Sequence, residues 1–417
     1  MAGRKHIIFH IDVNSAYLSW TALEKLKNGS KTDLRTIPSI IGGDEKSRHG
    51  VVLAKSIPAK KYGIQTGEPV AAALRKCPGL VMEPPDHKLY RRYSQAMIQL
   101  LSEEFSSELE QVSIDECYMD FTSVSSRYAS PEEAAALIRD RILEAFGFTV
   151  NVGISTAKVL AKMASDFEKP GKIHTLYPEE IREKMWPLPV SDLFMVGRRS
   201  ASKLEGLGLR TIGELAQADP AFLAAHFKSH GKLMWEYANG IDPSPVVTEK
   251  QEAKGIGNST TLSEDVTEAA KAKEILFSLS ESVARRLQKA GQLAGTVTVE
   301  IKYFDFTKAS HQTQAFSPVN RAEDICRLAC SLFDELWDGR PVRLLGIRSS
   351  KLTAKDEPVQ LSIFDLPPAA GKEPKKEEAV QAPSSEKLQK LDAAMEKIRR
   401  KYGENAVHRG SLRTKDS

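Results

Sequence analysis

Two adjacent acidic residues, Asp115 and Glu116, interrupt an apolar run at residues 112–121. Carboxylates inside a strand-like segment are costly to bury unless a cation neutralises them. Side chains alternate between the two faces of a strand, so we expect Asp115 to share a face with Cys117, and Glu116 with Tyr118. Both acids can serve one site only if the chain bends beside them, at a hairpin turn or a strand end.

A second strand-like run, residues 7–13, also carries a carboxylate near its end, that of Asp12. Magnesium binds to proteins through one or two carboxylates together with waters and substrate phosphates, so few protein ligands suffice. The sequence therefore predicts that Asp12, Asp115 and Glu116 meet in space and hold Mg²⁺.

The composition places these acids in a multidomain globular protein. A chain of 417 residues is too long for one ordinary core and predicts two to four domains. Hydrophobic residues make up 41% and charged residues 27%, as is usual for soluble proteins, and the net charge of +4 does not by itself indicate nucleic-acid binding. Lys and Arg also occur in local pairs, which indicate phosphate binding only where several share one surface.

The cysteines and the apolar segments predict a cytoplasmic location. The four cysteines lack Cys-x-x-Cys spacing, and we interpret Cys326 and Cys330 as helical packing partners with reduced thiols. At the N-terminus, Arg4 and Lys5 precede an apolar run that Asp12 breaks, so we expect no signal peptide. No apolar stretch approaches the length of a membrane span.

The order of elements up to residue 172 indicates an α+β layer, with a mixed or antiparallel sheet backed by helices. Asn14 and Ser15 are positioned to cap the first helix. Residues 60–85 are basic and rich in turn residues, which is consistent with a small subdomain. The expected strands are 6–13, 37–41, 51–57, 112–121 and 148–154, and the expected helices are 16–27, 87–106, 131–146 and 155–166.

Residues 187–240 are expected to form short helices separated by glycines, notably near Gly197, Gly208 and Gly213. The pattern resembles helix-hairpin-helix modules, whose backbone N–H groups hold one nucleic-acid phosphate without reading sequence. The alternative is an ordinary helical packing unit.

Residues 253–354 predict a separate α+β unit in which polar and apolar side chains alternate along the first strand. Its polar sheet face lies either along a nucleic-acid backbone or against solvent. The expected helices are 267–290 and 321–337, and the expected strands are 296–304 and 342–352.

A short apolar segment, residues 360–364, follows this unit. Such a peptide has nothing of its own to pack against, which is typical of a docking peptide. Residues 371–385 are rich in Lys, Glu, Pro and Ser and predict disorder, and residues 387–402 predict a basic amphipathic helix without an assigned role.

These motifs, in this order, resemble those of Y-family translesion DNA polymerases, and within that family the bacterial polymerase IV type. The resemblance covers roughly residues 6–365. It rests on His10-Ile11-Asp12, on Ser113–Glu116 with Tyr118 and Asp120, on Ala161–Asp166 with Lys169-Pro170, and on the glycine hairpins after Val196.

The resemblance implies a multidomain α+β protein with a right-hand polymerase fold. The expected parts are a palm of mixed sheet and helices (1–22 and 83–172), small fingers (23–82), a helix-hairpin-helix thumb (173–240), a linker (241–252), an α+β little finger (253–354), and a clamp-binding peptide with a mostly disordered tail (355–417).

The implied activity is template-directed, error-prone DNA synthesis past lesions. In this reaction two magnesium ions assist transfer of a nucleotide from a deoxynucleoside triphosphate to the primer 3′-hydroxyl, with release of pyrophosphate. Asp12 and Asp115 are expected to bridge both ions, Glu116 to hold the catalytic ion, and the Val13 carbonyl to bind the nucleotide-side ion. Tyr17 matches the steric gate that rejects a ribose 2′-hydroxyl, and the alternative for Tyr17 is a core helix residue.

The expected triphosphate contacts depart in part from the family pattern. Lys169 matches the family's triphosphate lysine, whereas Lys60 stands where arginine is usual and lacks its bidentate fork. Ile57 replaces a usual tyrosine and loses its hydroxyl donor. Ala54 replaces a threonine and Ala16 an aromatic residue, so we expect nucleotide affinity and selectivity to differ from the family norm.

In the thumb, Met195 replaces a common first hairpin glycine. The phosphate contact there is expected to be weaker than the one near Gly206 and Gly208.

The implied partners are primed DNA, deoxynucleoside triphosphates and the sliding clamp, which is the beta subunit of the replicative polymerase. We expect a monomer with no membrane contact. Clamp docking places Leu361, Ile363 and Phe364 in an apolar pocket with Gln360 beside it, and tethering raises the local concentration of an enzyme with low processivity.

Two other functions are weighed. A non-catalytic DNA- and clamp-binding homologue is motivated by Ala54 and Ile57, but it leaves the buried carboxylates as costly relics. A nucleotidyl cyclase that shares the palm chemistry does not explain the glycine hairpins or the docking peptide.

Overall fold

The computed structural model describes residues 6–43, 50–249 and 252–354, so the predicted docking peptide and the tail helix lie outside the described residues. The chain divides into two compact units, Met1–Gln251 and Glu252–Ser417. Each unit has its own hydrophobic core. The division falls one residue before the predicted start of the C-terminal α+β unit.

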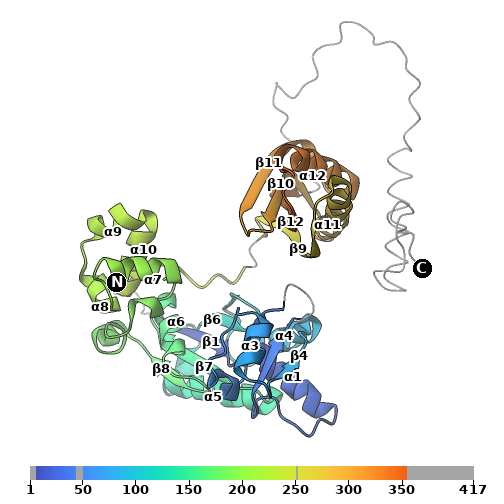
Figure 1. Ribbon diagram of the computed structural model, residues 1–417. Coiled ribbons are helices and arrows are strands. Elements are labelled where there is room, and N and C mark those ends of the chain that lie inside the picture. Colours follow the sequence, from blue (N-terminus) through green and yellow to red (C-terminus); the bar gives the residue numbers. More distant parts are fainter. Residues whose placement is uncertain (1–5, 44–49, 250–251, 355–417) are drawn as a thin grey trace, which may run out of the picture. The chain divides into compact units, whose positions relative to one another are not determined.

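A five-stranded sheet forms the centre of the first unit (Figure 1). All neighbouring strands are antiparallel except β7 and β8, so the predicted mixed sheet is confirmed. In spatial order its strands are β5 (Leu109–Gln111), β6 (Glu116–Asp120), β1 (Ile8–Val13), β7 (Val150–Ser155) and β8 (Ile173–Thr175).

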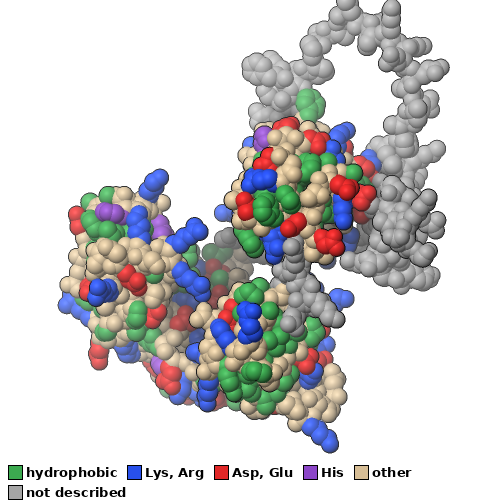
Figure 2. Space-filling model, in the orientation of Figure 1, with side chains coloured by type: hydrophobic (Ala, Val, Ile, Leu, Met, Phe, Trp, Pro, Cys, Tyr) green, Lys and Arg blue, Asp and Glu red, His purple; other side chains and the backbone are tan. Residues whose placement is uncertain are grey.

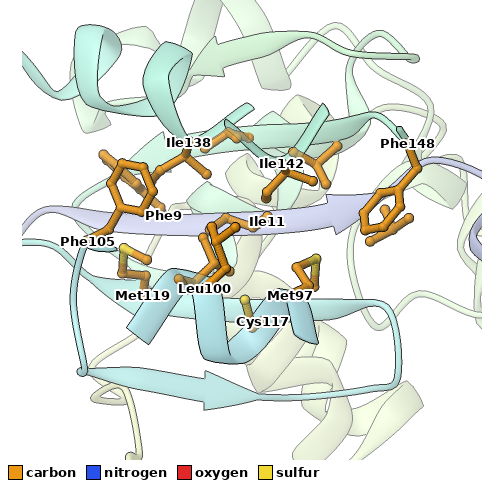
Figure 3. Close-up of a cluster of buried hydrophobic side chains, with 14 of the residues drawn as sticks. Phe9, Ile11, Met97, Leu100, Phe105, Cys117, Met119, Ile138, Ile142 and Phe148 are labelled. Atoms are coloured by element: carbon orange, nitrogen blue, oxygen red, sulfur yellow. The ribbon is translucent and has the colours of Figure 1, made fainter. Parts of the chain in front are cut away.

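One face of this sheet packs against α4 (His87–Glu104) and α5 (Pro131–Phe146). Figure 3 shows Phe9 and Ile11 of β1 among side chains from these helices. Helix α5 begins where the Ser130 hydroxyl accepts a hydrogen bond from Glu133 N, and it ends at Gly147, whose φ of 82° suits glycine. Burying side chains of this size stabilises the fold by about 1.5–3 kcal/mol each.

The other face of the sheet meets α6 (Lys158–Asp166). The alternating residues Ile8, His10 and Asp12 of β1 lie on this side, because Phe9 and Ile11 occupy the opposite core. Gly153 on β7 lets α6 approach closely, since a Cβ at this position would lie 2.0 Å from the Ala161 carbonyl oxygen and 2.5 Å from Ser165 N. This approach brings the α6 side chains to the ends of β1 and β6.

Helix α1 (Ala16–Lys27) has the predicted bounds, but the predicted cap is wrong. Ser15 lies in the left-handed region at φ 48° and its side chain caps nothing. The Asn14 side chain instead donates to Asn151 Oδ1 and accepts from Gly171 N, so it ties the end of β1 to two neighbouring segments.

A small three-stranded sheet with its own apolar cluster occupies residues 39–83. The predicted strand 51–57 is too long, because Ser56 accepts a hydrogen bond from Ala59 N and Pro58 lies in the first turn, so a helix begins at Ile57. The elements are β2 (Ser39–Gly42), β3 (Val52–Lys55), β4 (Val81–Glu83), α2 (Ile57–Lys60) and α3 (Val70–Lys76).

Short helices follow β8, as predicted, and pack around one apolar cluster. Met195 adopts φ 72°, a conformation that suits glycine and that costs other residues about 1–2 kcal/mol. The longer helices are α7 (Arg198–Gly206), α8 (Ile212–Gln217), α9 (Pro220–Phe227) and α10 (Ser229–Ala238), and the shorter helical turns are Pro178–Glu180, Ile181–Met185 and Val190–Asp192. A further short turn, Ser125–Arg127, lies earlier in the chain, between β6 and α5.

The first half of the predicted linker is packed against the sheet, which corrects its interpretation as a plain polar connector. Val246 contacts a cluster formed by Ile8, Tyr118 and Ala161. Asp242 Oδ2 accepts from Val159 N at 3.0 Å, and Val247 N donates to Glu110 Oε2 at 2.8 Å. We call residues 242–247 the strap.

The second unit is a four-stranded antiparallel sheet with two helices on one face. Strands β9 and β11 were not predicted, because their polar, largely exposed sequences lack a clear apolar alternation. The elements are β9 (Gly255–Val266), α11 (Ala269–Lys289), β10 (Gln292–Tyr303), β11 (Lys308–Val319), α12 (Ala322–Leu336) and β12 (Val342–Ala354).

No helix in the described ranges combines the length and the apolar character that a membrane span requires.

Candidate active site

The chain bends immediately before Glu116, as the two adjacent acids require. Val112 N and Ser113 N both donate to the Glu116 carbonyl oxygen, at 3.1 and 3.3 Å, and this tight turn joins β5 to β6. Asp115 therefore lies in the turn and Glu116 begins the strand. Glu116 pairs with Asp12 in the sheet register, and Val13 N donates to the Asp115 carbonyl oxygen at 3.0 Å. The three predicted acids thus come from one end of two adjacent strands.

Two lysines occupy positions beside these acids. Lys169 Nζ binds Asp12 Oδ2 and also lies 2.9 Å from Asp166 Oδ1. Lys162 Nζ lies 3.0 Å from Glu116 Oε2. These ion pairs engage two of the three acids, and among the described residues no three His, Cys, Asp or Glu side chains are gathered closely enough to hold a metal ion.

The acids differ in their electrostatic surroundings. The pKa of Glu116 is lowered to about 2. The hydrogen bond from His10 is the largest cause, the charge of Lys162 adds to it, and burial opposes both. Burial raises the pKa of Asp115, and the charges of Asp12 and Glu116 raise it further, although the Ser113 hydroxyl donates to it at 2.6 Å. A metal cation bound here would offset the negative charges around Asp115 and favour its ionised form.

A pocket of about 560 Å³ opens beside the acids. Its lining joins residues that are far apart in the sequence: the α1 start, the end of β3, α2, the turn at Asp115, and Lys169. Both predicted triphosphate lysines, Lys60 and Lys169, line it, and so do Tyr17 and the Val13 position. Lys55 and Thr66 also line the pocket and were not predicted.

Tyr17 is both a pocket residue and a packed one. Its ring stacks on Tyr90 with centroids 4.3 Å apart and planes 8° apart. The Thr21 hydroxyl lies 3.0 Å from the Tyr90 hydroxyl and 2.8 Å from the Tyr17 carbonyl oxygen. The ring is therefore held in one orientation at the pocket wall.

Two residues that depart from the family pattern, Ala54 and Ile57, make part of the pocket wall apolar. Ile57 is 55% exposed and lines the pocket. Ala54 lines it too and packs against the apolar cluster that contains Leu18 and Ile41. Lys60 is exposed, and its ammonium has no ion-pair partner among the described residues, so it is free to meet an anion.

Two residues beside Glu116 were not predicted as part of the site, His10 and Ser165. Nε2 of His10 lies 3.3 Å from Glu116 Oε2, and Nδ1 lies 2.8 Å from the Ser165 hydroxyl. The signal for His10 was present in the sequence, because two-residue alternation along β1 places it on the face of Asp12. Ser165 could not be found this way, since it comes from a helix whose packing depends on Gly153.

Comparisons with known proteins agree with this arrangement. Family models match the impB/mucB/samB family at residues 11–166, its C-terminal domain at 253–363, and its helix-hairpin-helix motif at 178–209. DNA polymerase IV of Clostridium acetobutylicum is 48% identical over 98% of this chain and 99% of the relative. DNA polymerase IV 1 of Bacillus subtilis is 36% identical over 100% of this chain and 95% of the relative.

A solved Y-family DNA polymerase chimera has the same fold, with a TM-score of 0.72 over 84% of this chain and 99% of the other, at 21% identity. With family models that cover both units and relatives that span nearly the whole chain, the protein belongs to the impB/mucB/samB family of Y-family polymerases, among its bacterial DNA polymerase IV members.

Proposed function

We propose that the protein is a template-directed DNA polymerase that inserts nucleotides opposite damaged bases. The observation that carries the proposal is that Asp12, Asp115 and Glu116 come from one end of two adjacent strands, and that Asp115 lines a pocket together with Lys60 and Lys169. In a metal-bound triphosphate the metal ion is positive and the phosphates are negative, so acids can bind the metal and lysines the phosphates.

The acids fit magnesium by their chemistry. The donor set consists of carboxylate oxygens and the Val13 carbonyl, and hard oxygen donors of this kind are the ligands that Mg²⁺ prefers. Burial and, after it, the charges of Asp12 and Glu116 raise the pKa of Asp115, and a bound cation would favour its ionised form. Asp12 and Asp115 would hold two ions, with Glu116 on the primer side; when bound, such ions activate the 3′-hydroxyl and stabilise the leaving pyrophosphate.

The chain's own side chains would position the substrate. Lys60 and Lys169 would contact the triphosphate, and the stacked ring of Tyr17 would close the space that a ribose 2′-hydroxyl needs. Ala54 and Ile57 lack the hydroxyl donors usual in the family at these positions, and Lys60 lacks the guanidinium fork, so we expect weaker nucleotide binding than the family norm.

Contacts to the DNA backbone would come from both units. In the first unit, the glycine hairpin before α7 presents backbone N–H groups at a helix start, beside Arg198 and Arg199. In the second unit, a hollow of about 640 Å³ on the open sheet face is lined by Lys308, Arg348 and polar residues. Figure 2 shows basic, acidic and hydrophobic side chains intermixed on the face of this unit in view, so charge alone does not mark the DNA path.

Primer extension tests the proposal. With Mg²⁺ and four deoxynucleotides, the protein should extend a primed template, undamaged and lesion-bearing, and Asp115→Ala should abolish extension while DNA binding persists. Wild-type protein that binds primed DNA but adds no nucleotide would instead be the non-catalytic homologue that Ala54 and Ile57 motivate. Extension that survives in Asp115→Ala would refute the assigned site.

We also propose that Gln360, Leu361, Ile363 and Phe364 dock on the sliding clamp. Deleting residues 360–364 should leave extension without clamp unchanged and abolish its stimulation by clamp loaded on the primed template. Equal stimulation of both proteins would exclude this peptide as the main contact.

A further inference from the structure

His10 is a buried polar side chain beside the proposed catalytic carboxylate. It is 1% exposed and lies on β1, two residues before Asp12. Its ring meets the ring of Tyr118 edge-on, with centroids 4.8 Å apart and planes 61° apart. Its two nitrogens contact different elements, since Nδ1 is 2.8 Å from Ser165 Oγ on α6 and Nε2 is 3.3 Å from Glu116 Oε2 on β6. The imidazole therefore links the helix to the acid.

The hydrogen-bond network assigns the proton of this ring. The Ser165 hydroxyl is 2.8 Å from both His10 Nδ1 and the Lys162 carbonyl oxygen, and its single proton can serve only one of them. Ser165 Oγ donates to the Lys162 carbonyl oxygen, because a carbonyl oxygen can only accept. At Nε2 the ring faces a carboxylate oxygen, which also can only accept, so the contact with Glu116 requires a proton on Nε2.

The contacts to Glu116 are unequal between its two oxygens. Both His10 Nε2 and Lys162 Nζ approach Oε2, at 3.3 and 3.0 Å. Within the described residues, Oε1 makes no hydrogen bond. The carboxylate is thus fixed through one oxygen and presents the other.

We propose that His10, oriented by Ser165, is a positioning residue that fixes the Glu116 carboxylate so that Oε1 is free to bind the primer-side cation. The inference rests on the proposed function and adds to it a residue that touches neither substrate nor metal. A hydrogen-bond donor behind a ligating carboxylate sets the orientation of that ligand, and losing such a partner typically weakens metal binding about 10–100-fold.

An apolar packing role for His10 makes a different prediction. A leucine in its place would fill similar space but would leave the Ser165 hydroxyl with only the Lys162 carbonyl oxygen, and Glu116 with only Lys162. Glutamine has an amide N–H that reaches the place of Nε2, whereas asparagine is too short to reach Glu116. The Gln and Asn variants therefore separate hydrogen bonding from packing.

The test is Mn²⁺ binding to the full-length protein without DNA or nucleotide, measured by electron paramagnetic resonance of the free ion. We expect His10→Leu and His10→Asn to weaken binding about 10–100-fold, and His10→Gln to stay within about threefold of wild type. Ser165→Ala should weaken binding less than His10→Leu, because the ring keeps its contact with Glu116 but loses its fixed orientation.

His174→Leu is the matched control. It changes a histidine of the same sheet, on β8, that makes no contact with Glu116, and it should leave Mn²⁺ binding unchanged. Melting curves verify that each variant is folded, and if His10→Leu is not, the comparison of His10→Gln with His10→Asn decides. Wild-type affinity in His10→Asn, or equal weakening in His10→Gln and His10→Asn, overturns the proposal.

A kinetic readout separates this inference from the proposed function. In single-nucleotide insertion, His10→Leu should raise the Mg²⁺ concentration needed for half-maximal rate while the affinity for primed DNA stays the same. An unchanged Mg²⁺ requirement with a lower maximal rate would mean a merely structural role. If the wild type extends no primer, the proposed function fails, but the Mn²⁺ comparison still tests His10.

Discussion

At the scale of single residues, Asp12 and the expected triphosphate compete for the ammonium of Lys169. Its ammonium lies on Asp12 in the structure, yet it lines the pocket in which a triphosphate is expected. A cation bound at Asp12 would repel this ammonium and leave it free for a phosphate oxygen. Lys169 would then act as the counterion of Asp12 before a cation binds and as a substrate ligand afterwards.

Lys169→Met tests this exchange. Loss of one charge-assisted hydrogen bond should raise the dissociation constant for the incoming nucleotide about 10–100-fold, measured by single-turnover insertion. Mn²⁺ binding without nucleotide should be unchanged or tighter, because no ammonium competes for Asp12. Lys172→Met is the matched control and should change neither, because it removes an exposed lysine whose ion-pair partner in the described part of the chain is Glu168. Weaker Mn²⁺ binding in Lys169→Met would mean that the lysine holds Asp12 in place.

Tyr17 is expected to set sugar selectivity through its fixed ring. Tyr17→Ala removes the ring that stacks on Tyr90 and should reduce discrimination against ribonucleotides about 100-fold. Tyr17→Phe keeps the ring and should keep the discrimination. The measurement is the ratio of insertion efficiencies for a deoxynucleotide and its ribonucleotide, and a ratio unaffected by Tyr17→Ala would make Tyr17 a packing residue only.

The thiols of Cys326 and Cys330 on α12 lie 3.6 Å apart and differ in acidity. A hydrogen bond from Cys326, followed by the charge of Lys273, lowers the pKa of Cys330, while the same pairing raises the pKa of Cys326. A thiol with a lowered pKa has more thiolate near neutral pH and is more reactive.

At pH 7.5, iodoacetamide should therefore modify Cys330 about tenfold faster than Cys326, as peptide mass spectrometry can measure. The buried Cys77 and Cys117 should react last. The difference should shrink as pH rises toward the pKa of Cys326, and Cys326→Ala should slow modification of Cys330. Equal rates at pH 7.5 would contradict the assigned donor.

At the scale of elements, the sequence predicted what depends on local pattern. The strand-like run at residues 7–13 predicted the strand that carries Asp12, and Pro131 and Phe146 bound α5 as expected. Polar strands such as β11 have no such pattern, and their pairing depends on partners far along the chain. The ion pairs of Lys162 and Lys169 could not be predicted from local sequence pattern either, because they require α6 to lie against the sheet.

Gly153 is the residue on which this approach of α6 depends. In Gly153→Ala the new methyl would lie 2.0 Å from the backbone oxygen of Ala161, and neither backbone can yield without moving the helix. We expect a loss of about 3 kcal/mol of unfolding free energy, measured by urea denaturation. Gly79→Ala, where no heavy atom lies within 4 Å, should change it by less than about 0.5 kcal/mol. If both variants match wild type, α6 does not pack as described.

At the scale of the whole molecule, the two units have separate cores and no shared cluster among the described residues. The strap belongs to the first unit, although its Pro- and Ser-containing sequence predicts a connector. Val246 is the strap residue that packs against the cluster of Ile8, Tyr118 and Ala161. Domains with separate cores unfold separately, so calorimetry of the full chain should resolve two transitions, and the isolated segment 252–417 should reproduce one of them.

Val246→Asp should then act on one transition alone. A carboxylate forced into the contact with Ile8 and Tyr118 should detach the strap and destabilise the first unit by about 1–3 kcal/mol. For a unit of this size the corresponding fall in melting temperature is about 2–10 °C. Thr248→Asp places the same charge on an exposed residue just beyond the strap and should shift neither transition. If Val246→Asp lowers both melting temperatures together, the two units are coupled through the strap and the single chain unfolds as one cooperative body.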